Sequence, residues 1–103
     1  MNEVNQLILD CLARVLRINQ TTDADIDFWI CGNVNGIMCQ GFKHGYANMV
    51  AEFGEHPRTD FTPLKDNDKW DGEIYTNHDD AEQKLRNLLV SLDELEKELI
   101  QSA

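Results

Sequence analysis

The sequence predicts an α+β fold in which an antiparallel sheet of three or four strands carries the long N- and C-terminal helices across one face. Apolar residues recur at helical spacing near each end of the chain, an Asn-Gly turn separates two apolar stretches, and both prolines fall in a turn-rich middle. The predicted order is therefore α-β-β-α-β-α. A chain of 103 residues supports one modest core, so we expect a single domain over residues 1–103.

The first helix is predicted from Asn2 to about Ile18, where apolar residues follow the spacing of one buried helical stripe. Asn2 can cap the helix, because its side-chain oxygen can accept a hydrogen bond from the first turn. The polar residues from Asn19 to Asp25 are expected to end it. Cys11 lies within the apolar stripe, which favours a buried and unreactive thiol.

A β-hairpin is predicted from residues 26–34 and 37–42, which flank Asn35 and Gly36. This dipeptide favours a two-residue type I′ turn, because both of its central residues need a positive φ. In that register the last residue of the first strand pairs with the first residue of the second.

The predicted register assigns the hairpin residues to two faces. Cys31 and Cys39 fall on opposite faces, so no disulfide is expected between them. Trp29 is expected to pair with Phe42 across the strands, on a face that we expect a helix or a loop to cover. The other face collects apolar residues, namely Ile26, Phe28, Ile30, Val34, Ile37 and Cys39.

A short middle helix is predicted from His44 or Gly45 to Phe53, since apolar residues keep helical spacing and Gly54 supplies a stop. Residues 55–77 are expected to be mainly loop. Within that stretch, residues 61–64 and 70–76 have the composition of short strands.

The last helix follows the capping residues at 77–80, and its leucines are spaced alternately by four and three. This stripe fits packing over the sheet. It also fits a homodimer through Leu92, Leu95 and Leu99, because the helix is long enough for residues 95–100 to overhang the domain.

The charge is the strongest constraint on function. The chain has 19 acidic and 9 basic residues, giving a net charge of −10 and a pI near 4.5. Residues 46–78 and 79–103 each hold seven acids and three bases, so the excess lies in the C-terminal half. Such a field repels nucleic acids and anionic membranes, and we expect neither as a direct partner. An odd number of cysteines without paired spacing favours a reducing, cytoplasmic location.

Metal and catalytic motifs do not fit the sequence. Residues 67–78 superficially resemble a calcium loop, but Lys69 would be a ligand and His78 would replace the required glutamate. The spacing of Cys31, Cys39, His44 and His56 matches no zinc site. No nucleophile or phosphate-loop motif is present. We therefore expect no metal or cofactor, and a non-enzymatic protein.

The favoured hypothesis is a small acidic inhibitor or adaptor that docks on a basic protein, such as one that handles nucleic acid. Carboxylates on a rigid fold would compete with phosphate for lysine and arginine, and neighbouring aromatics would anchor the partner. DNA-mimicking inhibitors and nuclease-immunity proteins resemble this chain in charge and size. The predicted partner-binding residues are Asp66, Asp68, Trp70, Asp71, Glu73, Tyr75, Asp79, Asp80 and Glu82.

The alternative hypothesis is a small enzyme or ligand-binding protein. Its site would lie on the second face of the sheet, at Trp29, Cys31, Met38 and His44. This alternative requires a pocket at that face.

Overall fold

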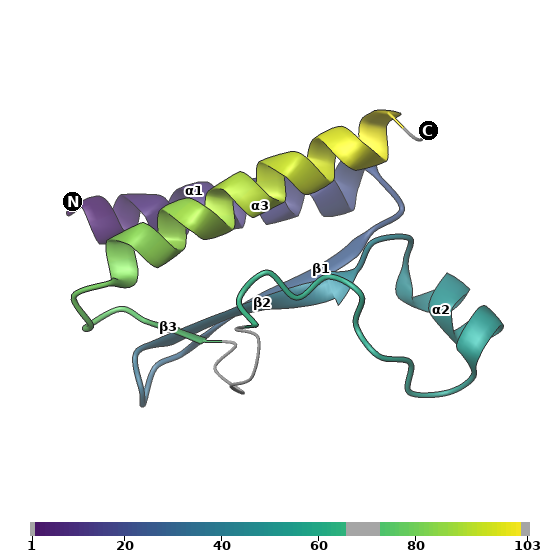
Figure 1. The fold of residues 1–103 in the computed structure, drawn as a ribbon, viewed down its shortest axis with the longest axis horizontal. Coiled ribbons are helices and arrows are strands. Elements are labelled where there is room, and N and C mark those ends of the chain that lie inside the picture. The colour runs from purple at the N-terminus through teal and green to yellow at the C-terminus, as the bar shows by residue number, and fades with distance from the viewer. Residues whose placement is uncertain (1, 66–72, 102–103) are drawn as a thin grey trace.

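Two layers build the protein, a three-stranded antiparallel sheet and a pair of long helices (Figure 1). The computed structural model describes residues 2–65 and 73–101. The order α-β-β-α-β-α is as predicted, and both long helices lie on one face of the sheet as expected. The elements are α1 (Glu3–Thr21), β1 (Asp25–Cys31), β2 (Gly36–Phe42), α2 (Tyr46–Phe53), β3 (Glu73–Tyr75) and α3 (Ala81–Gln101).

Helix α1 begins as predicted and ends later. The Asn2 side chain caps it by accepting a hydrogen bond from the Asn5 amide at 2.8 Å. The helix continues to Thr21, whose hydroxyl donates to the Arg17 carbonyl at 2.7 Å. One stripe of α1 enters the core, formed by Leu7, Cys11, Val15 and Ile18.

Helix α3 lies beside α1 and closes the core with its leucine stripe (Figure 1). Leu92, Leu95 and Leu99 are 0%, 2% and 7% exposed, so the predicted dimer through these residues is wrong. The predicted overhang is also wrong, because this end of the helix still packs on the core. Near this end, Ile100 is the one exposed large apolar residue among the described residues, at 62%.

Ion pairs join α1 to α3 along their outer sides. Arg17 donates two hydrogen bonds to Glu96, at 2.7 and 2.6 Å. Arg14 Nη1 lies 2.5 Å from Asp93 Oδ1, in a charge contact whose geometry is not aligned for a hydrogen bond. These contacts fix the two helices relative to each other.

The hairpin forms, but its predicted register is wrong. The loop has four residues, 32–35, and Cys31 pairs with Gly36. Only Asn35 has a positive φ, of 54°, whereas a type I′ turn needs one at Gly36 as well. Gly36 instead pairs with Tyr75 of β3, and the Asn35 carbonyl accepts from the Thr76 amide at 2.8 Å. Contacts with the third strand therefore lengthen the loop.

Each β1 residue pairs four residues earlier along β2 than predicted, so Trp29 lies opposite Met38 and not Phe42. An even shift leaves every side chain on its predicted face. Cys31 and Cys39 accordingly remain on opposite faces, and all three cysteines are free. Ile30 and Val34 do not join the core, however, and are 59% and 45% exposed near the hairpin tip.

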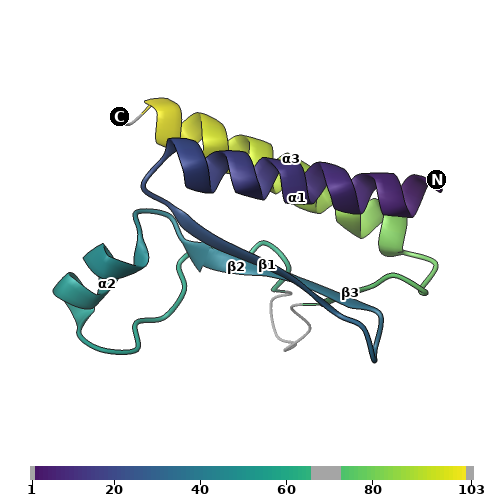
Figure 2. The same cartoon turned by 180° about the vertical axis from the view of Figure 1, so that it is seen from behind.

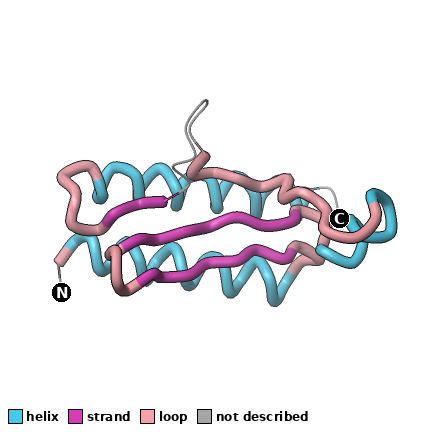
Figure 3. The backbone as a smooth tube through the Cα atoms, turned by 90° about the horizontal axis from the view of Figure 1, so that it is seen from below, coloured by secondary structure: helices cyan, strands magenta, loops and turns pink. Residues whose placement is uncertain are grey.

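Within the described residues, no helix covers the face of the sheet away from α1 and α3, so of the predicted cover by a helix or a loop the helix is absent there. Figure 3 looks at this face, and both α1 and α3 lie behind the strands. Helix α2 lies at one end of the sheet and contributes no buried residue (Figure 1). In place of the predicted strand at 61–64, Phe61 makes an isolated bridge to Gly41. Of the other predicted strand, residues 70–72 lie outside the described residues.

Asn19 ties the end of α1 to the edge of β1. Its side-chain oxygen accepts from the Ile26 amide and its side-chain nitrogen donates to the Ile26 carbonyl, both at 2.8 Å. The Asn19 side-chain amide thus makes the same pair of hydrogen bonds to the Ile26 backbone that a residue of a neighbouring strand would make. Opposite Ile26, Gly41 allows the strands to approach closely, because a Cβ there would lie 2.2 Å from the Asp25 carbonyl oxygen.

Candidate partner-binding face

The side chains opposite the core form what we call the outer sheet face. Ile26, Ile37, Cys39 and Ile74 are buried beneath the helices, so the alternating residues point the other way. Beyond the Asp25–Phe42 pair at the α2 end, three rows cross the strands on this side. The outer sheet face comprises Asp27 and Gln40 in one row, Trp29, Met38 and Glu73 in the next, and Cys31 and Tyr75 in the third.

The centre of the outer sheet face is aromatic and apolar. Trp29, Met38 and Tyr75 are all half-buried, although no helix lies over them. Between Cys31 and Tyr75 the middle strand has Gly36, and a Cβ there would lie 2.8 Å from Glu73 Oε2. The Glu73 carboxylate therefore lies over the space left by this glycine, next to the apolar centre.

The two charged side chains of the outer sheet face are both acidic, and the nearest described cations, Arg58 and Lys65, line a hollow next to its Gln40. The three described strands contain no lysine or arginine, and Asp27 and Glu73 form no ion pair with a described residue. Most described cations are engaged on or next to the long helices. They are Arg14, Arg17, Lys43, Lys84 and Arg86, which pair with carboxylates there.

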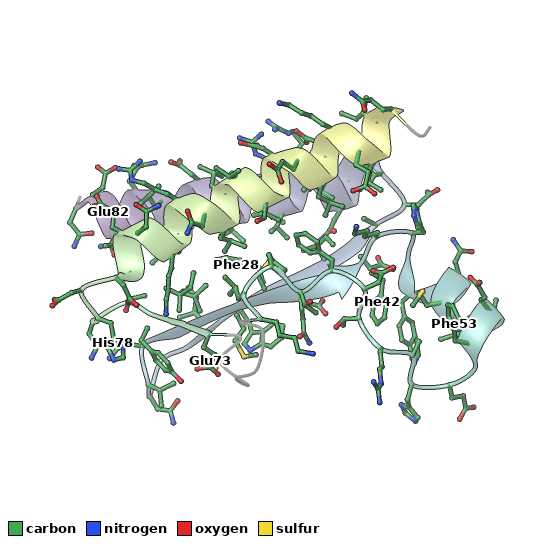
Figure 4. The ribbon with its side chains drawn as sticks, viewed as in Figure 1. Phe28, Phe42, Phe53, Glu73, His78 and Glu82 are labelled. Atoms are coloured by element: carbon green, nitrogen blue, oxygen red, sulfur yellow. The ribbon has the colours of Figure 1, made fainter. Side chains whose placement is uncertain are left out.

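The predicted acidic site does not form one cluster in the described part of the chain. Four of its residues, Asp66, Asp68, Trp70 and Asp71, lie outside the described residues. Glu73 and Tyr75 are on the outer sheet face. The other three lie at the start of α3, and Figure 4 shows Glu82 beside the helices, apart from Glu73. These are Asp79, Asp80 and Glu82.

Two of these helix-start acids already have partners. Asp80 contacts Lys84 at 3.2 Å, and Glu82 contacts Arg86 at 3.5 Å. Between the two groups, the rings of Tyr75 and His78 lie 5.0 Å apart, which joins β3 to the turn before α3. The outer sheet face is thus the better defined part of the acidic surface.

The alternative predicted site is brought together only in part. Trp29, Cys31 and Met38 share the outer sheet face. His44 instead lines a hollow of about 630 Å³ beside the end of α3, together with Lys43 and Ile100. Asp27 was missing from both predicted sites. Its position could have identified it, because residues two apart in a strand, such as Asp27 and Trp29, lie on the same face.

The core thiols are poor nucleophiles. Burial, with a smaller contribution from Asp10, raises the pKa of Cys11 to about 11, and its Sγ lies 3.7 Å from the Leu85 carbonyl oxygen. Burial raises the pKa of Cys39 to about 12. Both thiols therefore stay protonated at neutral pH. A hollow of about 520 Å³ borders Cys39, and its lining contains cations but no histidine base among described residues.

Metal binding finds no support in the described part of the chain, where no three histidine, cysteine or acidic side chains converge. The first half of the weak calcium-loop pattern, residues 67–72, lies outside the described residues. Among the described helices, none has the length and apolar character that crossing a membrane requires. Comparisons with protein-family models, with curated proteins and with solved structures give no match.

Proposed function

We propose that the protein is a non-enzymatic inhibitor or adaptor that docks its outer sheet face on a basic protein. The observation that carries this proposal is a sheet face over which no described helix lies, and whose aromatic centre is next to carboxylates that form no ion pair with a described residue. Exposed acids steer a cationic partner and pair with its lysines and arginines, while aromatics supply the contact area that dominates binding energy. Trp29 and Tyr75 are suited to this anchoring role.

The partner we favour handles nucleic acid, because its phosphate-binding cations would match this surface. By covering those cations, the protein would compete with nucleic acid and inhibit by occlusion. Asp79 and the acids at 66–71 would extend the acidic contact beyond the sheet. Three free thiols and the absence of paired cysteine spacing support a cytoplasmic setting.

The test uses affinity capture from cell extract at low and high ionic strength, followed by binding measurements with the purified partner. Asp27→Asn combined with Glu73→Gln should weaken binding at least roughly tenfold, since two charged contacts are lost. Glu52→Gln combined with Glu55→Gln changes the net charge equally at the far end of the molecule. That control pair should leave the affinity within about twofold.

Two further results bear on the proposal. Binding should weaken steeply between about 50 and 300 mM salt, and double-stranded DNA should displace the protein from its partner. A captured protein that binds the Asp27 and Glu73 variants normally would overturn the assignment of the face. Salt-insensitive binding would overturn the electrostatic basis of the proposal.

A further inference from the structure

The free edge of β1 is defined by the Asn19 contact. The Ile26 amide and carbonyl bond Asn19, so they point away from β2. Backbone direction alternates along an antiparallel strand, which means that Phe28 and Ile30 also direct their backbone groups outward. No described residue bonds these groups. The open part of the edge is therefore two residues long, with its start blocked by Asn19.

An apolar flank of α1 lies above this edge. Figure 2 shows α1 running above β1 along one long side of the molecule. Because Asn19 reaches the edge, residues spaced 3, 7, 10, 11 and 14 before it lie on the same side of the helix. We call them the α1 flank: Asn5, Ile8, Leu9, Leu12 and Leu16. Leu9 and Leu16 are 45% and 48% exposed.

The α1 flank carries no charge, although 27% of the residues in the chain are charged. The charged residues Glu3, Arg14 and Arg17 instead contact α3 on the other side of the helix. The two sides of the β1 edge therefore differ. Above the edge are the α1 flank and the exposed Ile30 side chain, whereas below it are Asp27 and the Trp29 ring.

We propose that this edge binds an extended segment of the partner in which apolar and basic side chains alternate. The segment would add a fourth strand by bonding the free backbone groups of Phe28 and Ile30. Its residues opposite these two would point towards the α1 flank, and the intervening residues would point to the outer sheet face. Apolar side chains suit the first set, and lysine or arginine beside Asp27 suits the second. The proposal rests on the proposed function, since it describes how a basic partner would reach that face.

A second copy of the protein fits this edge poorly. Paired strands lie about 4.8 Å apart, whereas packed helix axes need about 8 to 10 Å. Helix α1 lies directly over β1 (Figure 3), so two copies paired through β1 would bring their α1 helices into overlap. Each copy also has a net charge of −10. An isolated segment brings no helix, and a basic one is attracted.

A synthetic peptide tests the proposal directly. The probe is an N-acetylated, C-amidated heptapeptide Arg-Val-Lys-Val-Arg-Val-Lys, measured by calorimetry and by hydrogen exchange on the full chain. We expect binding that slows amide exchange at Phe28 and Ile30. The matched control peptide carries N-methyl groups on its valines, which keeps every side chain and charge but removes the strand bonds. It should bind at least roughly tenfold more weakly.

Variants of the edge separate backbone pairing from other contacts. Ile30→Pro removes an outward amide without touching the β1–β2 bonds, and Ile30→Ala keeps that amide. Only the proline variant should lose most peptide binding, and its melting temperature will show whether it folds. Asn19→Ala should release the Ile26 groups, add Ile26 to the amides protected by the peptide, and strengthen binding about threefold to tenfold.

The outcomes separate this inference from the proposed function. If the Asp27 and Glu73 variants lose the basic partner but Ile30→Pro does not, the face is correct and the edge inference is overturned. Equal binding of the N-methylated peptide would also overturn it. Sedimentation should show a monomer without peptide; a dimer abolished by Ile30→Pro would assign the edge to a second copy.

Discussion

Removing the Asn19 side chain should destabilise the protein despite its exposed position. Asn19→Ala deletes two hydrogen bonds of 2.8 Å to the Ile26 backbone. Each such bond contributes about 0.5 to 1.5 kcal/mol to stability. Alanine regains about 0.5 kcal/mol through its higher helix propensity. The expected net loss in the free energy of unfolding is therefore about 0.5 to 2.5 kcal/mol.

The matched control is Gln20→Ala, one residue further along the same exposed turn. Within the described residues the Gln20 side chain makes no hydrogen bond, so this change should be neutral or slightly stabilising. Urea denaturation followed by circular dichroism gives the free energy of unfolding for both variants. At this chain length each kcal/mol lowers the melting temperature by roughly 4 to 8 °C. Equal stability of the two variants would refute the structural role of the Asn19 amide.

Three further predictions concern the thiols, an ion pair and a close strand contact. At pH 8 only Cys31 should react rapidly with Ellman's reagent in the folded protein, because burial keeps both core thiols protonated; all three should react in denaturant. Hydrogen bonds from Arg17 lower the pKa of Glu96, so its contribution to stability is present above the unfolded-state pKa and is lost as the pH falls through the lower folded-state value. Glu96→Gln should reduce this acid sensitivity in pH-dependent melting. Gly41→Ala should cost more than about 2 kcal/mol of unfolding free energy in urea, whereas Gly32→Ala, which meets nothing within 4 Å, should cost little.

Each of these has a clear contrary result. Rapid reaction of two or more thiols in the folded state would show that the core opens readily. An unchanged acid transition in Glu96→Gln would mean that the ion pair between Glu96 and Arg17 makes no measurable contribution to stability. Equal stability of the two glycine variants would contradict the close approach of β1 and β2.

The sequence predicted the elements better than the contacts between them. Helical spacing located both long helices, because their buried stripes obey one local period. The hairpin register depended on a third strand distant in sequence, whose pairing with Gly36 no local turn rule contains. Leu92 and Leu95 fitted either a dimer or a sheet, and only the position of α1 decided between them.

The candidate site was predicted in fragments. Glu73 and Tyr75 were identified from the acidic stretch, and Trp29 and Met38 from the hairpin, as parts of two competing hypotheses. The structure places all four on one face because β2 lies between β1 and β3. Asp27 was missed, since its significance depends on which face of the sheet remains uncovered.

The pairing of α1 with α3 has a consequence for biosynthesis. Arg17 and Glu96 are 79 positions apart in sequence, and the leucines that seal the core belong to the last helix. While the chain emerges from the ribosome, the apolar stripe of α1 stays exposed to solvent until α3 has been translated and can pack on it. Nascent chains should therefore be the most aggregation-prone form of this molecule, and a stop codon before α3 should yield insoluble or rapidly degraded product.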